Sequence, residues 1–201
     1  MRRAAANTMK YRGIDMQDYH EFLQEVLISE AAIQQRVAEL GAQISQDYAG
    51  QGLVLVCILR GGVMFLSDLM RKITIPHMLE FMAVSSYGLG ARRTSGQSRI
   101  TLDLNVDIHD HNVLLVEDIV DSGYTIKAVL ELLSARQPRS LRVCALLDKA
   151  ERREVPVPLD YAGFVIPDKF VFGYGLDADE YYRNLPFIGV LSTERYRPPT
   201  A

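Results

Sequence analysis

Apolar runs and amphipathic stretches alternate along the chain, and this alternation predicts an α/β fold. The apolar runs are four to seven residues long, which suits buried strands. These expected strands cover residues 53–59, 79–84, 113–116, 141–147 and 161–166, and a shorter alternating strand covers 100–104.

Three amphipathic stretches separate these runs and are expected to form helices. Their apolar residues recur at three- and four-residue spacing, which places them on one helix face. The helices should start near Ser29, with Ser29 as the N-cap, near Val63 and near Tyr124. Strands that alternate with helices favour a central parallel sheet flanked by helices.

The segment from Val113 to Thr125 carries the strongest chemical signal. Its apolar run leads directly into Glu117 and Asp118, and Asp121 follows just before the expected helix. Ligands bind at the carboxyl ends of strands in open parallel sheets. The free N–H groups and dipole of a helix N-terminus favour an anion. We therefore expect acids and an anion cradle side by side.

Three carboxylates within five residues repel one another unless a cation or ligand hydroxyl groups relieve the repulsion. Mg²⁺ is the natural candidate, since it prefers oxygen ligands and pairs with phosphates. Two simpler interpretations remain open. In the first, Asp121 or Ser122 simply caps the helix and has no chemical role. In the second, the Glu117–Asp118 pair belongs to a receiver domain, although such a pair normally lies near the start of the chain.

Composition limits the classes of protein and partner. The 201 residues are 48% hydrophobic, enough for one core, and the net charge of −3 offers no basic field for nucleic acid. No apolar stretch approaches the ~18 residues of a membrane span. Cys57 and Cys144 lie in apolar runs outside any CxxC pair, as buried thiols of a reducing compartment do. We expect a cytoplasmic protein with no nucleic-acid or membrane partner.

Two segments do not follow the alternation. Residues from Ser85 to about Ser98 are rich in Gly, Arg, Ser and Thr between two short strands, so they are either disordered or a functional lid. The tail from Pro167 is dense in aromatic residues and glycine.

The segment Val113–Thr125 resembles the phosphoribosyl-diphosphate (PRPP) binding motif of type I phosphoribosyltransferases. Other motifs occur in the order found in hypoxanthine-guanine phosphoribosyltransferases: Leu59–Gly62, Ser86–Tyr87, Leu147–Lys149 and Ile166–Val171 through Arg183. The resemblance covers roughly residues 20–195. It implies one domain over residues 1–201, with a core at about 29–166 and a small hood from about 1–28 and 167–201.

The resemblance also implies a reaction. In this family a 6-oxopurine, hypoxanthine or guanine, displaces pyrophosphate from C1 of PRPP with Mg²⁺, giving IMP or GMP in purine salvage. A homodimer or homotetramer is implied as well. Two alternatives are a xanthine-preferring relative and a PRPP-binding regulator on the same fold, which would tend to carry an added DNA-binding domain or a basic face.

The family's roles map onto the opening motif residue by residue. Glu117 and Asp118 resemble the carboxylates that hold the ribose hydroxyls and Mg²⁺. Asp121 resembles the general base near N7 of the purine. It also opens the 5-phosphate loop, whose other members are Ser122, Gly123, Tyr124 and Thr125.

The purine side is implied by later motifs. Lys149 resembles the donor to the purine O6, which would select against adenine because an amino group there would face a donor. Phe170 resembles the residue that stacks on the purine, and the Val171 backbone resembles the group that reads its edge. Asp177 resembles a residue on the purine side that is also the ligand of a second Mg²⁺, bound with pyrophosphate.

The pyrophosphate side is implied by Arg60, Gly61 and Arg183. Relatives hold a non-proline cis peptide at the position of Leu59–Arg60, and many have Lys where this chain has Arg60. Ser86 and Tyr87 resemble the start of a mobile lid that excludes water from the reacting groups.

Overall fold

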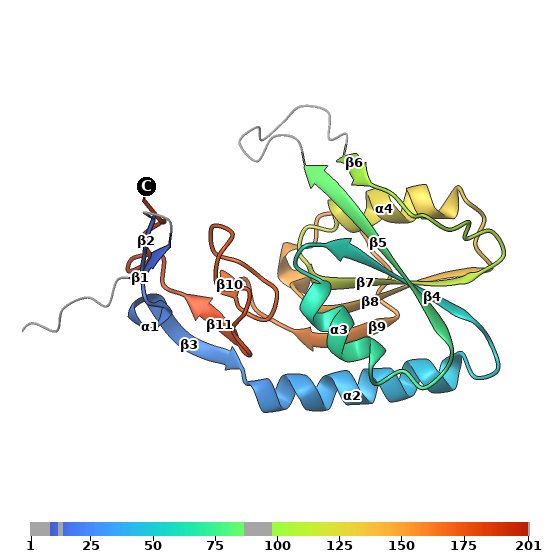
Figure 1. Cartoon of the computed structure of the whole chain (residues 1–201), viewed down its shortest axis with the longest axis horizontal. Coiled ribbons are helices and arrows are strands. Elements are labelled where there is room, and N and C mark those ends of the chain that lie inside the picture. The colour runs from blue at the N-terminus through green and yellow to red at the C-terminus, as the bar shows by residue number, and fades with distance from the viewer. Residues whose placement is uncertain (1–8, 12–13, 87–97, 201) are drawn as a thin grey trace, which may run out of the picture. The chain divides into compact units, whose positions relative to one another are not determined.

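The computed structural model describes residues 9–11, 14–86 and 98–200 of the chain (Figure 1). Tyr87 and the rest of the expected lid up to residue 97 lie outside the described residues. The chain divides into a larger unit, Gln34–Asp168, and a smaller unit made of Met1–Ile33 and Lys169–Ala201. Each unit is described by itself.

The larger unit is built on a six-stranded sheet in the order β6-β5-β4-β7-β8-β9. Five strands are parallel to one another, and β6 at the edge runs antiparallel to β5. The strands are β4 (Leu53–Leu59), β5 (His77–Ser86), β6 (Ser98–Leu102), β7 (Asn112–Val120), β8 (Ser140–Asp148) and β9 (Tyr161–Val165). The predicted α/β architecture is confirmed.

The helices lie where the amphipathic pattern predicts them. They are α2 (Glu30–Asp47), α3 (Val63–Met70) and α4 (Tyr124–Ser134), with a short 3₁₀ turn, η1, at Ala150–Arg152. Ser29 caps α2, because its hydroxyl accepts a hydrogen bond from the backbone N–H of Ala32 at 3.3 Å. Ile33, Val37, Leu40 and Ile44 form the fully buried face of α2.

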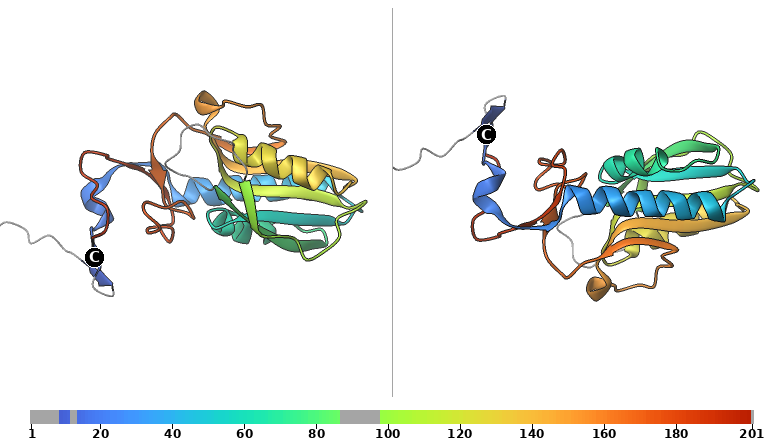
Figure 2. Two further views of the ribbon diagram at one scale, coloured as in Figure 1. Left: turned by 90° about the horizontal axis from the view of Figure 1, so that it is seen from above. Right: turned by 90° about the horizontal axis from the view of Figure 1, so that it is seen from below.

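The order of the strands creates a switch point between β4 and β7. The chain leaves β4 through α3 to reach β5 on one side, and it leaves β7 through α4 to reach β8 on the other. Because βαβ crossovers are right-handed, α3 and α4 cover opposite faces of the sheet (Figure 2). One face packs against Ile126, Val129 and Leu133 of α4. Ligands bind at the carboxyl ends of the strands where such a reversal occurs.

The predicted end of the central strand at Val116 is wrong. Strand β7 continues to Val120, so Glu117 and Asp118 lie inside the strand. Its pairing with β4 stops at Val116, where it meets Cys57, but its pairing with β8 continues to Val120, where it meets Asp148. The acids are therefore on the part of β7 that has only one neighbouring strand.

The smaller unit is formed by both ends of the chain, as the resemblance predicts. Its main sheet is antiparallel in the order β10-β11-β3, and a hairpin of β1 and β2 and a short helix accompany it. The elements are β1 (Met9–Tyr11), β2 (Ile14–Met16), α1 (Tyr19–Phe22), β3 (Leu23–Ile28), β10 (Val171–Phe172) and β11 (Ile188–Leu191).

The core of the smaller unit is aromatic. The Phe22 ring is completely buried and meets the rings of Phe172, Tyr182 and Tyr196 at centroid distances of 5.2, 5.1 and 4.9 Å. Edge and tilted arrangements of this kind are favourable between aromatic rings. Over the described part of both units, no helix has the length and apolar character needed to cross a membrane.

Candidate functional site

The loop after β4 and the acidic end of β7 lie directly against each other at the switch point. Gly61 follows a cis peptide bond between Leu59 and Arg60, which matches the position expected from relatives. A Cβ atom placed on Gly61 would lie 1.6 Å from Oδ2 of Asp118. Any side chain at residue 61 would therefore displace that carboxylate, so glycine allows the loop to lie this close to the acid pair.

Glu117 and Asp118 form a pair of partly or fully buried carboxylates. Asp118 is 8% exposed, and its Oδ1 accepts a hydrogen bond from the backbone N–H of Ile119 at 2.8 Å. Burial, reinforced by the neighbouring Asp118 carboxylate, raises the pKa of Glu117 well above its usual value. Oε2 of Glu117 is buried and accepts no hydrogen bond from any residue that the structure describes. The pair is thus prepared for a cation or for hydroxyl donors.

This pair fits Mg²⁺ as part of a shared site. Among the described residues, no three His, Cys, Asp or Glu side chains gather closely enough to hold a metal ion alone. Mg²⁺ commonly binds through one or two carboxylates and completes its shell with water and substrate oxygens. Two carboxylates with one unsatisfied buried oxygen meet that requirement.

The turn between β7 and α4 has the form of an anion cradle. Gly123 is the N-cap of α4 and has a φ of 92°, a left-handed conformation that favours glycine. A cavity of about 230 Å³ lies here and is lined by Glu117, Ile119, Val120, Asp121, Ser122, Gly123, Thr125 and Ile126. The Tyr124 side chain is more than half exposed.

Asp121 lies between two cations. Nζ of Lys149 is 4.0 Å from Oδ2 of Asp121 and 4.0 Å from Oδ1 of Asp168. Nε of Arg152 is 3.3 Å from Oδ1 of Asp121, although that oxygen is buried and accepts no hydrogen bond of good geometry among the described residues. Lys149 is only 6% exposed, so it is not a solvated lysine at a strand end.

Sequence reasoning did not identify Arg152 or Arg153. Both belong to the charged stretch from Glu151 to Glu154, which has the composition of an ordinary surface loop. In the structure the Arg153 side chain is mostly buried, and its guanidinium donates to the backbone carbonyls of Val120 and Asp121. No sequence signal distinguishes it from its neighbours.

The smaller unit holds four of the predicted residues, Phe170, Val171, Asp177 and Arg183. Phe170 is 53% exposed, and Val171 is buried in β10. Asp177 and Arg183 form an ion pair at 2.8 Å within one loop. Arg183 also donates to the Gly175 carbonyl at 2.8 Å, so its guanidinium holds both sides of the loop together.

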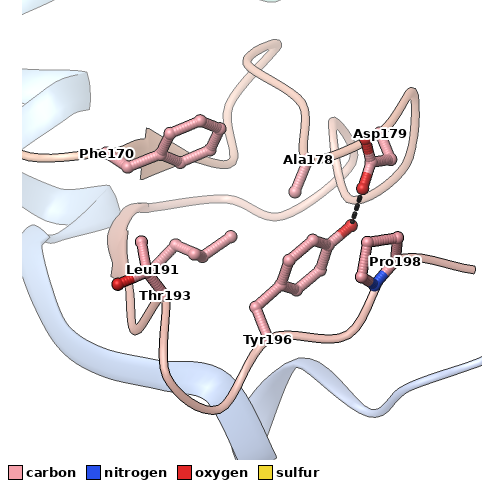
Figure 3. Close-up of a pocket in the computed structure, with 7 residues that line it drawn as sticks. All are labelled: Phe170, Ala178, Asp179, Leu191, Thr193, Tyr196 and Pro198. Carbon is pink, nitrogen blue, oxygen red and sulfur yellow. Dashed lines mark hydrogen bonds between the residues drawn. The ribbon is translucent and has the colours of Figure 1, made fainter.

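A cavity of about 330 Å³ lies within the smaller unit beside this loop (Figure 3). The rings of Phe170 and Tyr196 line it, and the Tyr196 hydroxyl donates a 2.8 Å hydrogen bond to Asp179. The other lining residues are Ala178, Leu191, Thr193 and Pro198. Tyr196 and Asp179 were also absent from the sequence prediction.

The fold brings one group of predicted residues together within the larger unit, at the carboxyl ends of β4, β7 and β8: Arg60, Gly61, Glu117, Asp118, Asp121, Ser122, Gly123, Thr125 and Lys149. Phe170, Val171, Asp177 and Arg183 form a second group within the smaller unit. The backbone of Ser86 ends β5, and Tyr87 lies outside the described residues.

Comparisons with a family model and with individual known proteins identify the same family. The model of the phosphoribosyl transferase domain family matches residues 25–179. The hypoxanthine phosphoribosyltransferase of Salmonella typhimurium is 51% identical over 167 residues, covering 82% of this chain and 93% of that protein. The hypoxanthine-guanine phosphoribosyltransferase of Mycobacterium tuberculosis is 49% identical over 181 residues, covering 87% and 89%.

Solved structures agree in fold. A crystal structure of a hypoxanthine phosphoribosyltransferase from Staphylococcus aureus superposes with a TM-score of 0.85 at 46% sequence identity. The match covers 90% of this chain and 97% of that one.

Proposed function

The chain belongs to the phosphoribosyl transferase family, among the hypoxanthine and hypoxanthine-guanine phosphoribosyltransferases of purine salvage, and on this premise we propose how its residues share the reaction. The observation that supports the proposal is the acid cluster of β7 beside the N-terminus of α4, at the switch point of the sheet. Acids for a sugar and a cradle for a phosphate are what PRPP requires.

Glu117 and Asp118 hold the 2- and 3-hydroxyl groups of the ribose. Carboxylates accept hydrogen bonds from such hydroxyls, and the unsatisfied Glu117 oxygen gives one of them a buried acceptor. The same two residues would hold Mg²⁺, and Asp177 would hold a second ion. Mg²⁺, when bound, would neutralise negative charge on the diphosphate that leaves.

The turn from Asp121 to Thr125 holds the 5-phosphate. Its backbone N–H groups precede the first turn of α4, where they have no partner within the helix. Gly123 lets the backbone approach the ligand, and Thr125 adds a hydroxyl. The exposed Tyr124 side chain contributes less than its backbone.

Asp121 acts as the general base at N7 of the purine, and Lys149 donates to O6. Their charged groups are 4.0 Å apart, so a single purine can contact both residues. Phe170 stacks on the purine and the Val171 backbone reads its edge. Arg60, Gly61 and Arg183 contact pyrophosphate, for which a guanidinium fork is suited.

The wider setting is also a proposal. We infer that residues 1–201 act as one phosphoribosyltransferase domain and that the protein works as a homodimer or homotetramer. The two described cysteines are buried free thiols, which supports a cytoplasmic location because such thiols are typical of reducing compartments.

The division of labour at β7 can be tested with isosteric variants. Asp121→Asn should lower kcat by roughly 10²–10⁴-fold and leave the Kd for PRPP with Mg²⁺ little changed, because the amide keeps the shape but accepts no proton. Asp118→Asn should instead weaken PRPP binding. Asp110→Asn is a control, since Asp110 pairs with Arg139 on the surface. An unchanged kcat for Asp121→Asn would refute the general-base role.

A further inference from the structure

We propose that Arg153 is a positioning residue that fixes the backbone of the 5-phosphate loop. This inference rests on the function proposed above. Arg153 would touch neither substrate. Its effect would pass through the two peptide groups that join residues 120 to 122, because it binds their carbonyls.

The Arg153 guanidinium uses its fork on two carbonyls and one carboxylate. Nε donates to the Asp121 carbonyl at 3.0 Å, and Nη2 donates to the Val120 carbonyl at 3.3 Å. Nη2 also pairs with Oδ1 of Asp148, the last residue of β8. The side chains of Arg153 and Asp148 are only 17% and 16% exposed, so water screens this pair weakly.

These contacts take the place of the hydrogen bonds between β7 and β8, which end at Val120. Beyond Val120 the chain leaves the sheet, and its carbonyls no longer face a neighbouring strand. The Val120 carbonyl also accepts from the Lys149 N–H at 3.0 Å, and the Ser122 carbonyl accepts from the N–H groups of Glu154 and Val155 at 3.0 and 3.2 Å. Three successive carbonyls are thus bound by the segment that contains Arg153.

The orientation of those carbonyls determines the orientation of the following N–H groups. In a trans peptide the C=O of one residue and the N–H of the next point in opposite directions. Carbonyls of Val120, Asp121 and Ser122 that face residues 149–155 therefore direct the N–H groups of residues 121, 122 and 123 away from that segment. Arg153 would thus prepare the N–H groups of residues 121 and 122 for an anion before PRPP arrives, and the backbone N–H groups of Glu154 and Val155 would do the same for residue 123.

Steric contact adds to this support. A Cβ atom on Gly123 would lie 3.0 Å from Cδ of Arg153 and 2.8 Å from the Val155 carbonyl oxygen. The aliphatic stem of Arg153 therefore limits the turn from one side. A shorter or more mobile side chain would leave space into which the turn could relax.

Arg153→Lys is the sharpest test, because it keeps the charge and loses the planar fork. One ammonium group cannot hold both carbonyls and Asp148 in the same geometry. We expect kcat/KM for PRPP to fall by at least about tenfold, mostly through KM, as expected when a binding group is misplaced. The KM for hypoxanthine should stay within about threefold, because Arg153 contacts no residue assigned to the purine apart from the Asp121 carbonyl.

Arg139→Lys is the matched control. Arg139 makes the same kind of two-bonded pair with Asp110, at 3.0 and 2.8 Å, but the two side chains are 55% and 63% exposed on the surface. Its kinetic constants should equal those of the unmodified protein. Thermal unfolding of both variants would show whether they are folded.

A folded Arg153→Lys variant with kcat/KM for PRPP within about twofold of the unmodified protein would overturn the inference. If that variant does not fold, Arg153→Gln with Asp148→Asn removes both buried charges together, and the same criterion applies to it. If the unmodified protein transfers no phosphoribosyl group, the proposed function itself fails, a result distinct from a failure of Arg153 alone.

Discussion

Lys149 illustrates how burial changes the meaning of a residue at the end of a strand. A lysine in that position is commonly solvated, but here the side chain is buried beside the carboxylates of Asp121 and Asp168. Burying a charge costs free energy unless an opposite charge or a hydrogen-bonding partner offsets it. Its ammonium group is therefore suited to meet an acceptor on an incoming purine.

Lys149→Ala should reduce kcat/KM for hypoxanthine and guanine by roughly tenfold to a hundredfold, the cost of a lost hydrogen bond to a charged donor. PRPP binding should change little. Lys127→Ala is the control, because Lys127 is exposed on α4 and its sole ion pair among the described residues is a long one, at 4.0 Å from Glu131. Steady-state kinetics with each purine would check this, and unaltered purine constants would disprove the role.

At this scale, the acids were predictable and the arginines were not. Glu117, Asp118 and Asp121 are separated by short intervals within a strand–turn–helix pattern, so their proximity follows from the sequence. Arg153 meets Asp148 across a loop whose path depends on tertiary packing. Its burial is a property of the folded loop and leaves no trace in local composition.

Among the elements, the turn that opens α4 depends most on one residue. Gly123 has a positive φ, and a Cβ atom placed on it would lie 2.8 Å from the Val155 carbonyl oxygen and 2.9 Å from Cγ2 of Val157. Gly50 offers a matched comparison, since it has a φ of 73° but no atom within 4 Å of a Cβ placed on it.

Gly123→Ala should therefore lose stability and PRPP affinity together, whereas Gly50→Ala should lose only the backbone term of ~1–2 kcal/mol. Denaturant unfolding and PRPP titration would measure both effects. Equal behaviour of the two variants would show that the contacts at Gly123 do not shape the phosphate loop.

In the smaller unit, the hydrogen bond from Tyr196 to Asp179 ties the C-terminal segment to the loop that carries Asp177 and Arg183. Tyr196→Phe keeps the ring against Phe22 and removes only the hydroxyl. We expect a loss of about 0.5–1.5 kcal/mol of stability, or a few degrees in Tm, and a raised KM for PRPP.

Tyr181→Phe provides the comparison for that loop, because the Tyr181 hydroxyl forms no hydrogen bond with any other described residue. It should behave as the unmodified protein in both thermal unfolding and kinetics. A Tyr196→Phe variant with the same Tm and the same KM would show that the bond to Asp179 holds nothing in place.

The boundaries of the elements show where local pattern fails. Residues 53–59 form β4 as predicted, because every position in the run is apolar and all but Leu59 are buried. Strand β7 extends four residues beyond its apolar run, since pairing with β8 continues through the acids. Strand β3 has an irregular burial pattern and pairs with β11, about 160 residues later.

For the whole molecule, the alternation of strands and helices was enough to predict the parallel sheet and its helices. The smaller unit was predicted only through resemblance, because its sheet joins segments from opposite ends of the chain. Non-local pairing of this kind has no periodicity that a local window can detect.

The most direct test of the central claim is the initial rate at which pyrophosphate is released from PRPP in the presence of Mg²⁺. Hypoxanthine, guanine, xanthine and adenine are compared as the acceptor. With hypoxanthine or guanine as the acceptor, the protein should release pyrophosphate from PRPP and form IMP or GMP. Adenine should be inert, because its amino group would face the Lys149 donor. Rapid release with adenine, or none with either hypoxanthine or guanine, would contradict the assignment.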